Sequence, residues 1–144
     1  MQSYQERPQF ITRPGIRTIL VVEDDVGVGS FLVAAIRQET RHDARLVGDG
    51  VQALNALESS VIDLVILDYN LPQMNGLEVY DRSYSMQGSD APPVVMISAR
   101  LPIGELAKRH VMSMQKPLEL DDFLDMIERL HPYPEEHAEP GERM

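Results

Sequence analysis

Short, mainly apolar runs alternate along this chain with longer segments in which apolar residues recur every three or four positions. Short apolar runs are typical of buried strands, and the longer period is typical of helices that pack on one face. The runs predict strands at residues 18–22, 44–47, 61–67, 94–97 and 111–115. The intervening segments predict helices at residues 26–39, 51–59, 77 to about 86, a short one near 105–110, and one that ends near 130.

Strands separated by helical segments form βαβ units, in which the strands run parallel and the crossovers are right-handed. The run at 61–67 is almost wholly apolar, as expected for a central strand covered by helices on both faces. We therefore predict an α/β fold, a five-stranded parallel sheet in a doubly wound, flavodoxin-like sandwich with strand order 2-1-3-4-5. Pro102 and Gly104 leave space for only a short helix before the last strand.

The folded domain is predicted to span residues 17–130. Residues 1–16 are polar and are expected to form a disordered N-terminal extension. Residues 131–144, which are rich in proline and glutamate, are expected to form a disordered acidic tail. No apolar run approaches the roughly 18 residues of a membrane span, so membrane insertion is not expected.

The chain carries a formal net charge of −10 and contains no cysteine. Most of the negative charge lies in the predicted domain, where residues 18–130 hold 18 acidic and 9 basic side chains. Binding to nucleic acid phosphates requires clustered Lys and Arg, so direct nucleic acid binding by this region is not expected. The absence of cysteine and of an apolar N-terminal signal core is consistent with a cytoplasmic location.

Polar side chains follow four of the predicted strands at the point where each strand ends. Glu23, Asp24 and Asp25 follow the first strand. The later strand ends carry one group each, namely Asp68, Ser98 and Lys116. Because an open parallel sheet gathers the carboxyl ends of its strands along one edge, where ligands bind, we expect these groups to meet in one crevice.

Carboxylates, a hydroxyl and an ammonium group in one crevice suit a divalent cation and a phosphoryl group. Mg²⁺ prefers oxygen ligands and keeps several waters, so Asp24 and Asp68 are candidate direct ligands, with Glu23 acting through a water. A carboxylate beside the cation can attack phosphorus and form an acyl phosphate, and we assign this role to Asp68. Lys116 would stabilise charge on the phosphoryl oxygens, and Ser98 would donate a hydrogen bond to them.

Each of these features alone has a simpler explanation. An acidic triplet is commonly a solvated loop, and a single Asp at a strand end is commonly a turn or cap residue. Only the joint occurrence of the groups at strand ends favours a binding site. The histidines show no ligand spacing and are expected at the surface: His42, His110, His131 and His137.

The motifs of this crevice resemble those of response-regulator receiver domains, the CheY-like superfamily, over about residues 17–130. They are Val21-Val22-Glu23-Asp24-Asp25, the loop from Asp68 to Gly76 with Pro72, Ser98-Ala99 and Lys116-Pro117. The resemblance implies that Asp68 is the phospho-acceptor, and that Glu23 and Asp24 are the acidic pair that binds Mg²⁺. It also implies that Lys116 binds phosphate and that Ser98 is the switch hydroxyl.

The same resemblance assigns roles to three further residues. The backbone carbonyl of Asn70 would bind Mg²⁺, and its side chain occupies a position at which the family tunes dephosphorylation. Arg100 occupies the other tuning position, two residues after the hydroxyl. Ala99 is small, as the family requires, and would leave the phosphoryl group accessible.

Two features depart from the family pattern. Ser113 stands three positions before Lys116, where the family usually has an aromatic switch residue. Aromatic coupling of the hydroxyl to the surface therefore cannot operate. Ser98 and Lys116 are 18 positions apart, a few fewer than usual, so the fourth helix is expected to be short, irregular or a loop. This puts dimerisation through the family's usual output face in doubt.

The leading hypothesis is a stand-alone receiver, a phospho-acceptor that supports its own phosphorylation and dephosphorylation and is not otherwise an enzyme. Its partners would be a sensor histidine kinase or a histidine phosphotransfer protein and an unknown downstream protein. The alternative is a receiver-like interaction module that works without phosphorylation. A third hypothesis, a Mg²⁺-dependent phosphatase, requires a second carboxylate two residues after Asp68, where Asn70 stands.

Overall fold

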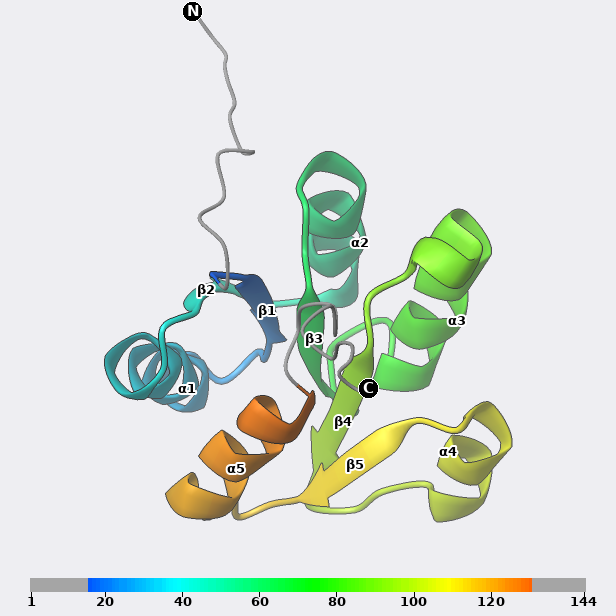
Figure 1. Cartoon of the computed structure of the whole chain (residues 1–144). Coiled ribbons are helices and arrows are strands. Elements are labelled where there is room, and N and C mark those ends of the chain that lie inside the picture. Colours follow the sequence, from blue (N-terminus) through cyan, green and yellow to red (C-terminus); the bar gives the residue numbers. More distant parts are fainter. Residues whose placement is uncertain (1–15, 131–144) are drawn as a thin grey trace, which may run out of the picture.

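The computed structural model describes residues 16–130, so the predictions for residues 1–15 and 131–144 lie outside its scope. Helices and strands alternate along the described chain (Figure 1). The strands are β1 (Thr18–Val22), β2 (Asp43–Val47), β3 (Leu64–Asp68), β4 (Val94–Ser98) and β5 (Met112–Gln115). The helices are α1 (Val26–Glu39), α2 (Gly50–Ser59), α3 (Gly76–Gln87), α4 (Ile103–Arg109) and α5 (Leu120–Leu130), with a 3-10 turn, η2, at Gly88–Asp90.

The strands form one parallel sheet in the order β2-β1-β3-β4-β5, which confirms the predicted topology. Helices α1 and α5 cover one face, and α2, α3 and α4 lie on the other (Figure 1). Successive residues of β1 point to opposite faces, so Val21 packs with α1 and α5 while Val22 packs with α2 and α3. All five residues of β3 are buried, as expected for the central strand.

Strand β3 begins at Leu64, three residues later than the apolar run predicted. Val61 is 73% exposed, whereas Asp63 is tied to the start of β1. The Asp63 backbone N–H donates to the Thr18 carbonyl (2.9 Å), and its carboxylate accepts from the Thr18 N–H (2.9 Å). Asp63 therefore does not extend β3 but forms hydrogen bonds with the first residue of β1.

Helix α4 is short, as predicted, with seven residues and Leu106 as its buried residue. It begins at Ile103, two residues before the predicted start, and ends at Arg109, followed by the cap residue His110 in the left-handed region (φ 56°). Along β5, the side chains of Met112, Ser113 and Gln115 are exposed. A short α4 thus leaves much of β5 uncovered.

One histidine contradicts the expectation of a surface position. His42 is buried, and its Nδ1 accepts a hydrogen bond from the Arg17 backbone N–H (3.3 Å). Its own backbone N–H donates to Thr40 Oγ1 (3.0 Å), so polar partners compensate for its burial.

Within residues 16–130, no helix combines the length and the apolar character needed to cross a membrane.

Candidate functional site

The parallel register brings the predicted strand-end residues to one edge of the sheet. Val22, the last residue of β1, lies beside Leu67 of β3, so Glu23 and Asp68 follow at the same level. Asp68 in turn lies beside Ile97 of β4, one residue before Ser98. Lys116 follows β5, and its backbone N–H donates to the Ser98 carbonyl (2.9 Å).

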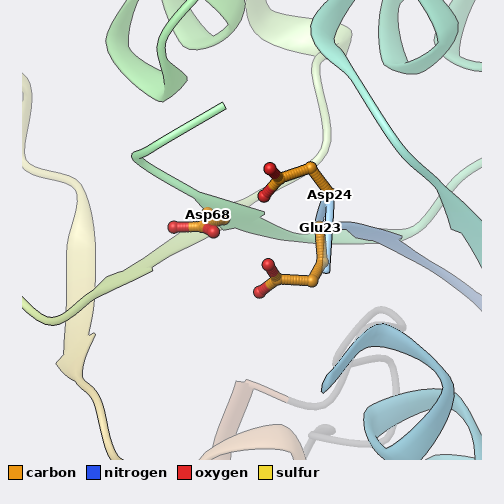
Figure 2. Close-up of side chains that lie close together, drawn as sticks. All are labelled: Glu23, Asp24 and Asp68. Carbon is orange, nitrogen blue, oxygen red and sulfur yellow. The ribbon is translucent and has the colours of Figure 1, made fainter. Parts of the chain in front are cut away.

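Three carboxylates face one another at this edge. Glu23, Asp24 and Asp68 each place a carboxylate oxygen within 4.8 Å of the others, and Figure 2 shows the three side chains lying close together. Glu23 is 2% exposed and Asp68 is 3% exposed, whereas Asp24 is open to solvent. The donor set is oxygen from carboxylates alone, with one exposed member, which fits a hard cation that retains water ligands.

The ammonium group of Lys116 joins this cluster. Its Nζ lies 2.8 Å from Glu23 Oε1 and 3.3 Å from Asp68 Oδ2. Burial alone would lower the pKa of Lys116, but the hydrogen bond to Glu23 and the charges of Asp68 and Glu23 outweigh it and raise that pKa. Burial raises the pKa of Glu23, with hydrogen bonds from Lys116 and the Asp25 N–H opposing the rise. Lys116 therefore stays charged across the physiological range.

The loop after Asp68 is shaped by close backbone contacts. The Tyr69 N–H extends the sheet by donating to the Ile97 carbonyl (2.9 Å), and the Gly76 N–H returns to the Tyr69 carbonyl (2.8 Å). A Cβ atom on Gly76 would lie 2.9 Å from the Asp68 carbonyl oxygen and 2.6 Å from Met96 Sδ. The close approach of α3 to the phospho-acceptor candidate therefore requires glycine at position 76.

Asn70 contacts both Asp68 and Ser98. Its backbone N–H donates to Asp68 Oδ1 (3.1 Å), and its side-chain Nδ2 donates to Ser98 Oγ (2.8 Å). Ser98 is buried, and its Oγ also accepts from the Arg100 N–H (3.3 Å). Ala99 is exposed at the start of the loop that follows β4. The side chains of Arg100 and Ser113 are likewise exposed.

Sequence reasoning missed two supporting residues. Asp25 was grouped with the acidic cluster, but its Oδ1 accepts from the Val28 N–H (3.0 Å) and caps the start of α1. Gln115 donates from Nε2 to the Ala99 carbonyl (3.2 Å) and so holds the loop after β4 from the side of β5. The position of Asp25 directly before a predicted helix was the available signal for the cap, whereas the Gln115 contact depends on side-chain geometry.

The fold and the site define a doubly wound α/β domain with carboxylates and a lysine at the carboxyl edge of its sheet. The model of the family "Response regulator receiver domain" matches residues 19–128. The chain belongs to this receiver family, whose members act in two-component signalling as phospho-acceptors.

Named relatives support this assignment. The DNA-binding response regulator MtrA of Mycolicibacterium paratuberculosis is 36% identical over 109 residues, which are 71% of this chain and 47% of that protein. The response regulator PmrA of Pseudomonas aeruginosa is 33% identical over 116 residues, which are 78% of this chain and 51% of that protein. The chain therefore spans about half the length of these relatives.

Solved structures share the fold at lower identity. A CheY-like receiver domain from Methanospirillum hungatei matches with a TM-score of 0.76 and 17% identity, over 85% of this chain and 99% of that one. The receiver domain of the sensor histidine kinase PA1611 from Pseudomonas aeruginosa matches with a TM-score of 0.70 and 21% identity, over 81% of this chain and 98% of that one. That structure holds a magnesium ion in its active-site cleft.

Proposed function

We propose that this domain accepts a phosphoryl group on Asp68 from the phosphohistidine of a sensor kinase or phosphotransfer protein, with Mg²⁺ bound beside it. The observation that carries the proposal is the position of the Asp68 carboxylate. Its Oδ2 atom lies 3.3 Å from the ammonium group of Lys116, and a carboxylate oxygen of Asp68 lies within 4.8 Å of those of Glu23 and Asp24. A turn or cap aspartate has no need of such neighbours.

In the transfer step, an oxygen of the Asp68 carboxylate attacks phosphorus as the phosphorus–nitrogen bond of phosphohistidine breaks. The imidazole nitrogen leaves with the bonding electron pair, and an acyl phosphate forms on Asp68. The Asn70 backbone N–H holds one carboxylate oxygen of Asp68 at 3.1 Å, and Lys116 Nζ holds the other at 3.3 Å. Fixed orientation of the nucleophile, with Lys116 near the developing negative charge, lowers the barrier.

Glu23, Asp24 and Asp68 are the residues that would hold Mg²⁺, together with the backbone carbonyl of Asn70. Three carboxylates are opposed by a single ammonium group, so the cluster retains negative charge that a divalent cation would neutralise. When bound, the cation supplies positive charge to the oxygens of the transferring phosphoryl group. It also offsets the repulsion between the phosphoryl group and the acidic residues around it.

The residues at the mouth of the site bear on the lifetime of the acyl phosphate. Ala99 is small and exposed, so it leaves the phosphoryl group accessible to water. Asn70 has no carboxylate that could act as a general base for hydrolysis of foreign substrates. By their resemblance to the tuning positions of the receiver family, Asn70 and Arg100 are assigned to tuning of dephosphorylation. We assign the domain no turnover of other phosphate esters.

The signal is proposed to pass to a downstream protein by direct contact. DNA binding is stated for the relative MtrA, which is about twice as long as the matched region. The surplus of acidic side chains in residues 18–130 supports the prediction that this domain does not itself bind nucleic acid.

The test is intact-mass measurement after incubation with Mg²⁺ and acetyl phosphate. The wild type is expected to gain one phosphoryl group, and Asp68→Asn is expected to gain none. Asp49→Asn is the matched control, because Asn also caps helices well and α2 keeps its N-cap. Chelation of Mg²⁺ with EDTA is expected to abolish the adduct.

The alternative of a phosphorylation-independent interaction module is favoured by one observation, the exposed Ser113 where the family places an aromatic residue. It predicts no adduct from acetyl phosphate or from any histidine kinase, together with partner binding that Asp68→Asn leaves unchanged. Steady release of inorganic phosphate from a phosphomonoester would instead support a phosphatase.

A further inference from the structure

Asn70 connects the phospho-acceptor candidate to the buried hydroxyl on the neighbouring strand. Its backbone N–H donates to Asp68 Oδ1 at 3.1 Å, and its side-chain Nδ2 donates to Ser98 Oγ at 2.8 Å. The second contact joins positions 28 residues apart in the sequence. A single residue of the loop after β3 therefore fixes groups at the ends of two strands.

The hydrogen bonds that Ser98 already accepts leave its hydroxyl free only to donate a hydrogen bond. A serine hydroxyl can accept two hydrogen bonds and donate one. The Oγ atom accepts from Asn70 Nδ2 (2.8 Å) and from the Arg100 backbone N–H (3.3 Å), so both acceptor positions are used. Because Ser98 is 1% exposed, bulk water does not compete for them. The hydroxyl can therefore make a further hydrogen bond only as a donor.

A phosphoryl group on Asp68 presents oxygens that accept hydrogen bonds. We propose that Asn70 is a positioning residue that orients the Ser98 hydroxyl as a donor toward this group. The inference rests on the proposed phosphorylation of Asp68. The Asn70 side chain then helps the domain to recognise its phosphorylated state, because it orients the Ser98 hydroxyl. This role is separate from any effect of Asn70 on hydrolysis of the acyl phosphate.

The backbone of Ser98 does not depend on Asn70 for its position. Ser98 is the last residue of β4, beside Gln115 of β5, and its carbonyl accepts from the Lys116 N–H (2.9 Å). The Asn70 amide thus restrains the orientation of the Ser98 hydroxyl, whereas the sheet holds the Ser98 backbone. Substitutions of the Asn70 side chain are therefore expected to preserve the fold.

A double-mutant cycle with beryllium fluoride, a tetrahedral mimic of a phosphoryl group on a carboxylate, tests the inference. Half-saturation in the presence of Mg²⁺ is measured by NMR for wild type, Ser98→Ala, Asn70→Asp and the double variant. Asn70→Asp keeps the side-chain shape, but its carboxylate has no N–H to donate and instead accepts the proton of Ser98. The double variant also corrects for the added negative charge.

Ser98→Ala is expected to weaken binding about tenfold in the wild-type background, the effect of one hydrogen bond to a charged group. In the Asn70→Asp background the same substitution is expected to have less than about a twofold effect, because the hydroxyl proton is already used. In NMR spectra of the wild type, Ser98→Ala is expected to shift the Asn70 side-chain amide protons. Asn55→Asp, at an exposed position on α2, is the control for charge and should leave the Ser98 effect intact.

An equal effect of Ser98→Ala in both backgrounds would overturn the inference, because the side chain at position 70 would then not control the hydroxyl. No effect of Ser98→Ala in the wild-type background would overturn it as well. Failure of the proposed function is seen separately, as a wild type that binds neither beryllium fluoride nor a phosphoryl group at Asp68. That outcome removes the inference together with its premise.

Discussion

Lys116 is bound more closely to Glu23 than to the phospho-acceptor candidate. Its Nζ lies 2.8 Å from Glu23 Oε1 and 3.3 Å from Asp68 Oδ2. The Glu23 side chain is 1% exposed, so little water is available to solvate its charge. The ammonium group therefore balances a buried acid in addition to facing the site of phosphoryl transfer.

Lys116→Met should destabilise the domain most strongly when Mg²⁺ is absent. The substitution leaves two buried carboxylates without their common donor, and we expect the free energy of unfolding to fall by about 1.5–3 kcal/mol. Added Mg²⁺ should restore much of this loss, because a cation held by the carboxylates replaces the missing positive charge. Urea unfolding with and without Mg²⁺ measures both effects.

Lys108→Met is the matched control, since Lys108 is exposed and pairs with Glu105 on the surface of α4. It should change stability by less than about 0.5 kcal/mol with or without Mg²⁺. If Mg²⁺ stabilised Lys116→Met no more than the wild type, the bound cation would not be replacing the positive charge of Lys116.

Gly76→Ala should destabilise the domain by about 1–3 kcal/mol, because the added methyl group has no space. The ideal Cβ position is 2.6 Å from Met96 Sδ and 2.9 Å from the Asp68 carbonyl oxygen. Relief of this overlap would displace the loop that carries Asp68, so the yield of phosphoryl adduct should fall as well. Thermal unfolding and intact-mass measurement report the two effects.

Gly104→Ala provides the comparison in α4, where a Cβ atom would meet nothing within 4 Å. Its stability should be unchanged or higher by up to about 1 kcal/mol, since alanine favours the helix. Equal stability of Gly76→Ala and the wild type would show that α3 can withdraw from the Asp68 loop without loss.

The topology and the strand-end residues could be predicted because both follow from periodicity along the chain. A buried parallel sheet needs continuous apolar strands, and its carboxyl ends must share one edge, so Asp68 and Lys116 were predicted to meet. The family match confirmed the class of protein.

The features of the fold and of the site that were not predicted depend on side-chain contacts that periodicity does not encode. The apolar run before Leu64 predicted extra strand residues, yet Asp63 forms paired hydrogen bonds with Thr18 there instead. His42 was expected at the surface because the histidines show no ligand spacing, but hydrogen bonds to neighbouring groups make its burial tolerable. The contact of Asn70 with Ser98 depends on side-chain rotamers across 28 positions, which no local pattern reports.

Asp63→Asn should be more stable than the wild type at neutral pH. Burial raises the pKa of Asp63 above its ordinary value of 3.8, although the Thr18 N–H and Arg17 oppose the rise. The folded state therefore binds more protons than the unfolded state just above pH 3.8, and stability decreases as pH rises through the raised pKa. Asparagine still accepts from the Thr18 N–H but cannot ionise.

The stability difference between Asp63→Asn and the wild type should be largest at neutral pH and should shrink as pH falls below the raised pKa. Urea unfolding at a series of pH values measures this dependence. Asp90→Asn, at an exposed position, controls for the loss of one charge. A constant difference across the pH range would show that ionisation of Asp63 is not the cause.

Ser113→Ala should affect neither the stability nor the phosphorylation of the domain. Its side chain is exposed on β5, and surface substitutions of this kind stay within about 0.5 kcal/mol. The lifetime of the phosphoryl group should also match that of the wild type. A more than twofold change in lifetime, measured by loss of the mass adduct over time, would assign Ser113 to the readout of the signal.

Arg109 is the main polar attachment of α4 to the rest of the domain. Its guanidinium donates to both carboxylate oxygens of Asp81 on α3, at 2.8 and 2.9 Å, and also to Glu105 Oε1 at 3.0 Å. The hydrogen bond from Arg109 lowers the pKa of Asp81. Since Leu106 is the buried residue of α4, apolar burial provides little additional attachment.

Arg109→Ala should therefore increase hydrogen exchange in α4 while the exchange of β1 and β3 stays unchanged. Arg109→Lys should give an intermediate rate, because an ammonium group keeps the charge but cannot form the paired hydrogen bonds of a guanidinium. Hydrogen exchange followed by mass spectrometry resolves peptides from α4 and from the central strands. If α4 exchanged at the wild-type rate in Arg109→Ala, the burial of Leu106 would be sufficient to hold the helix, and local opening would not depend on its ion pair with α3.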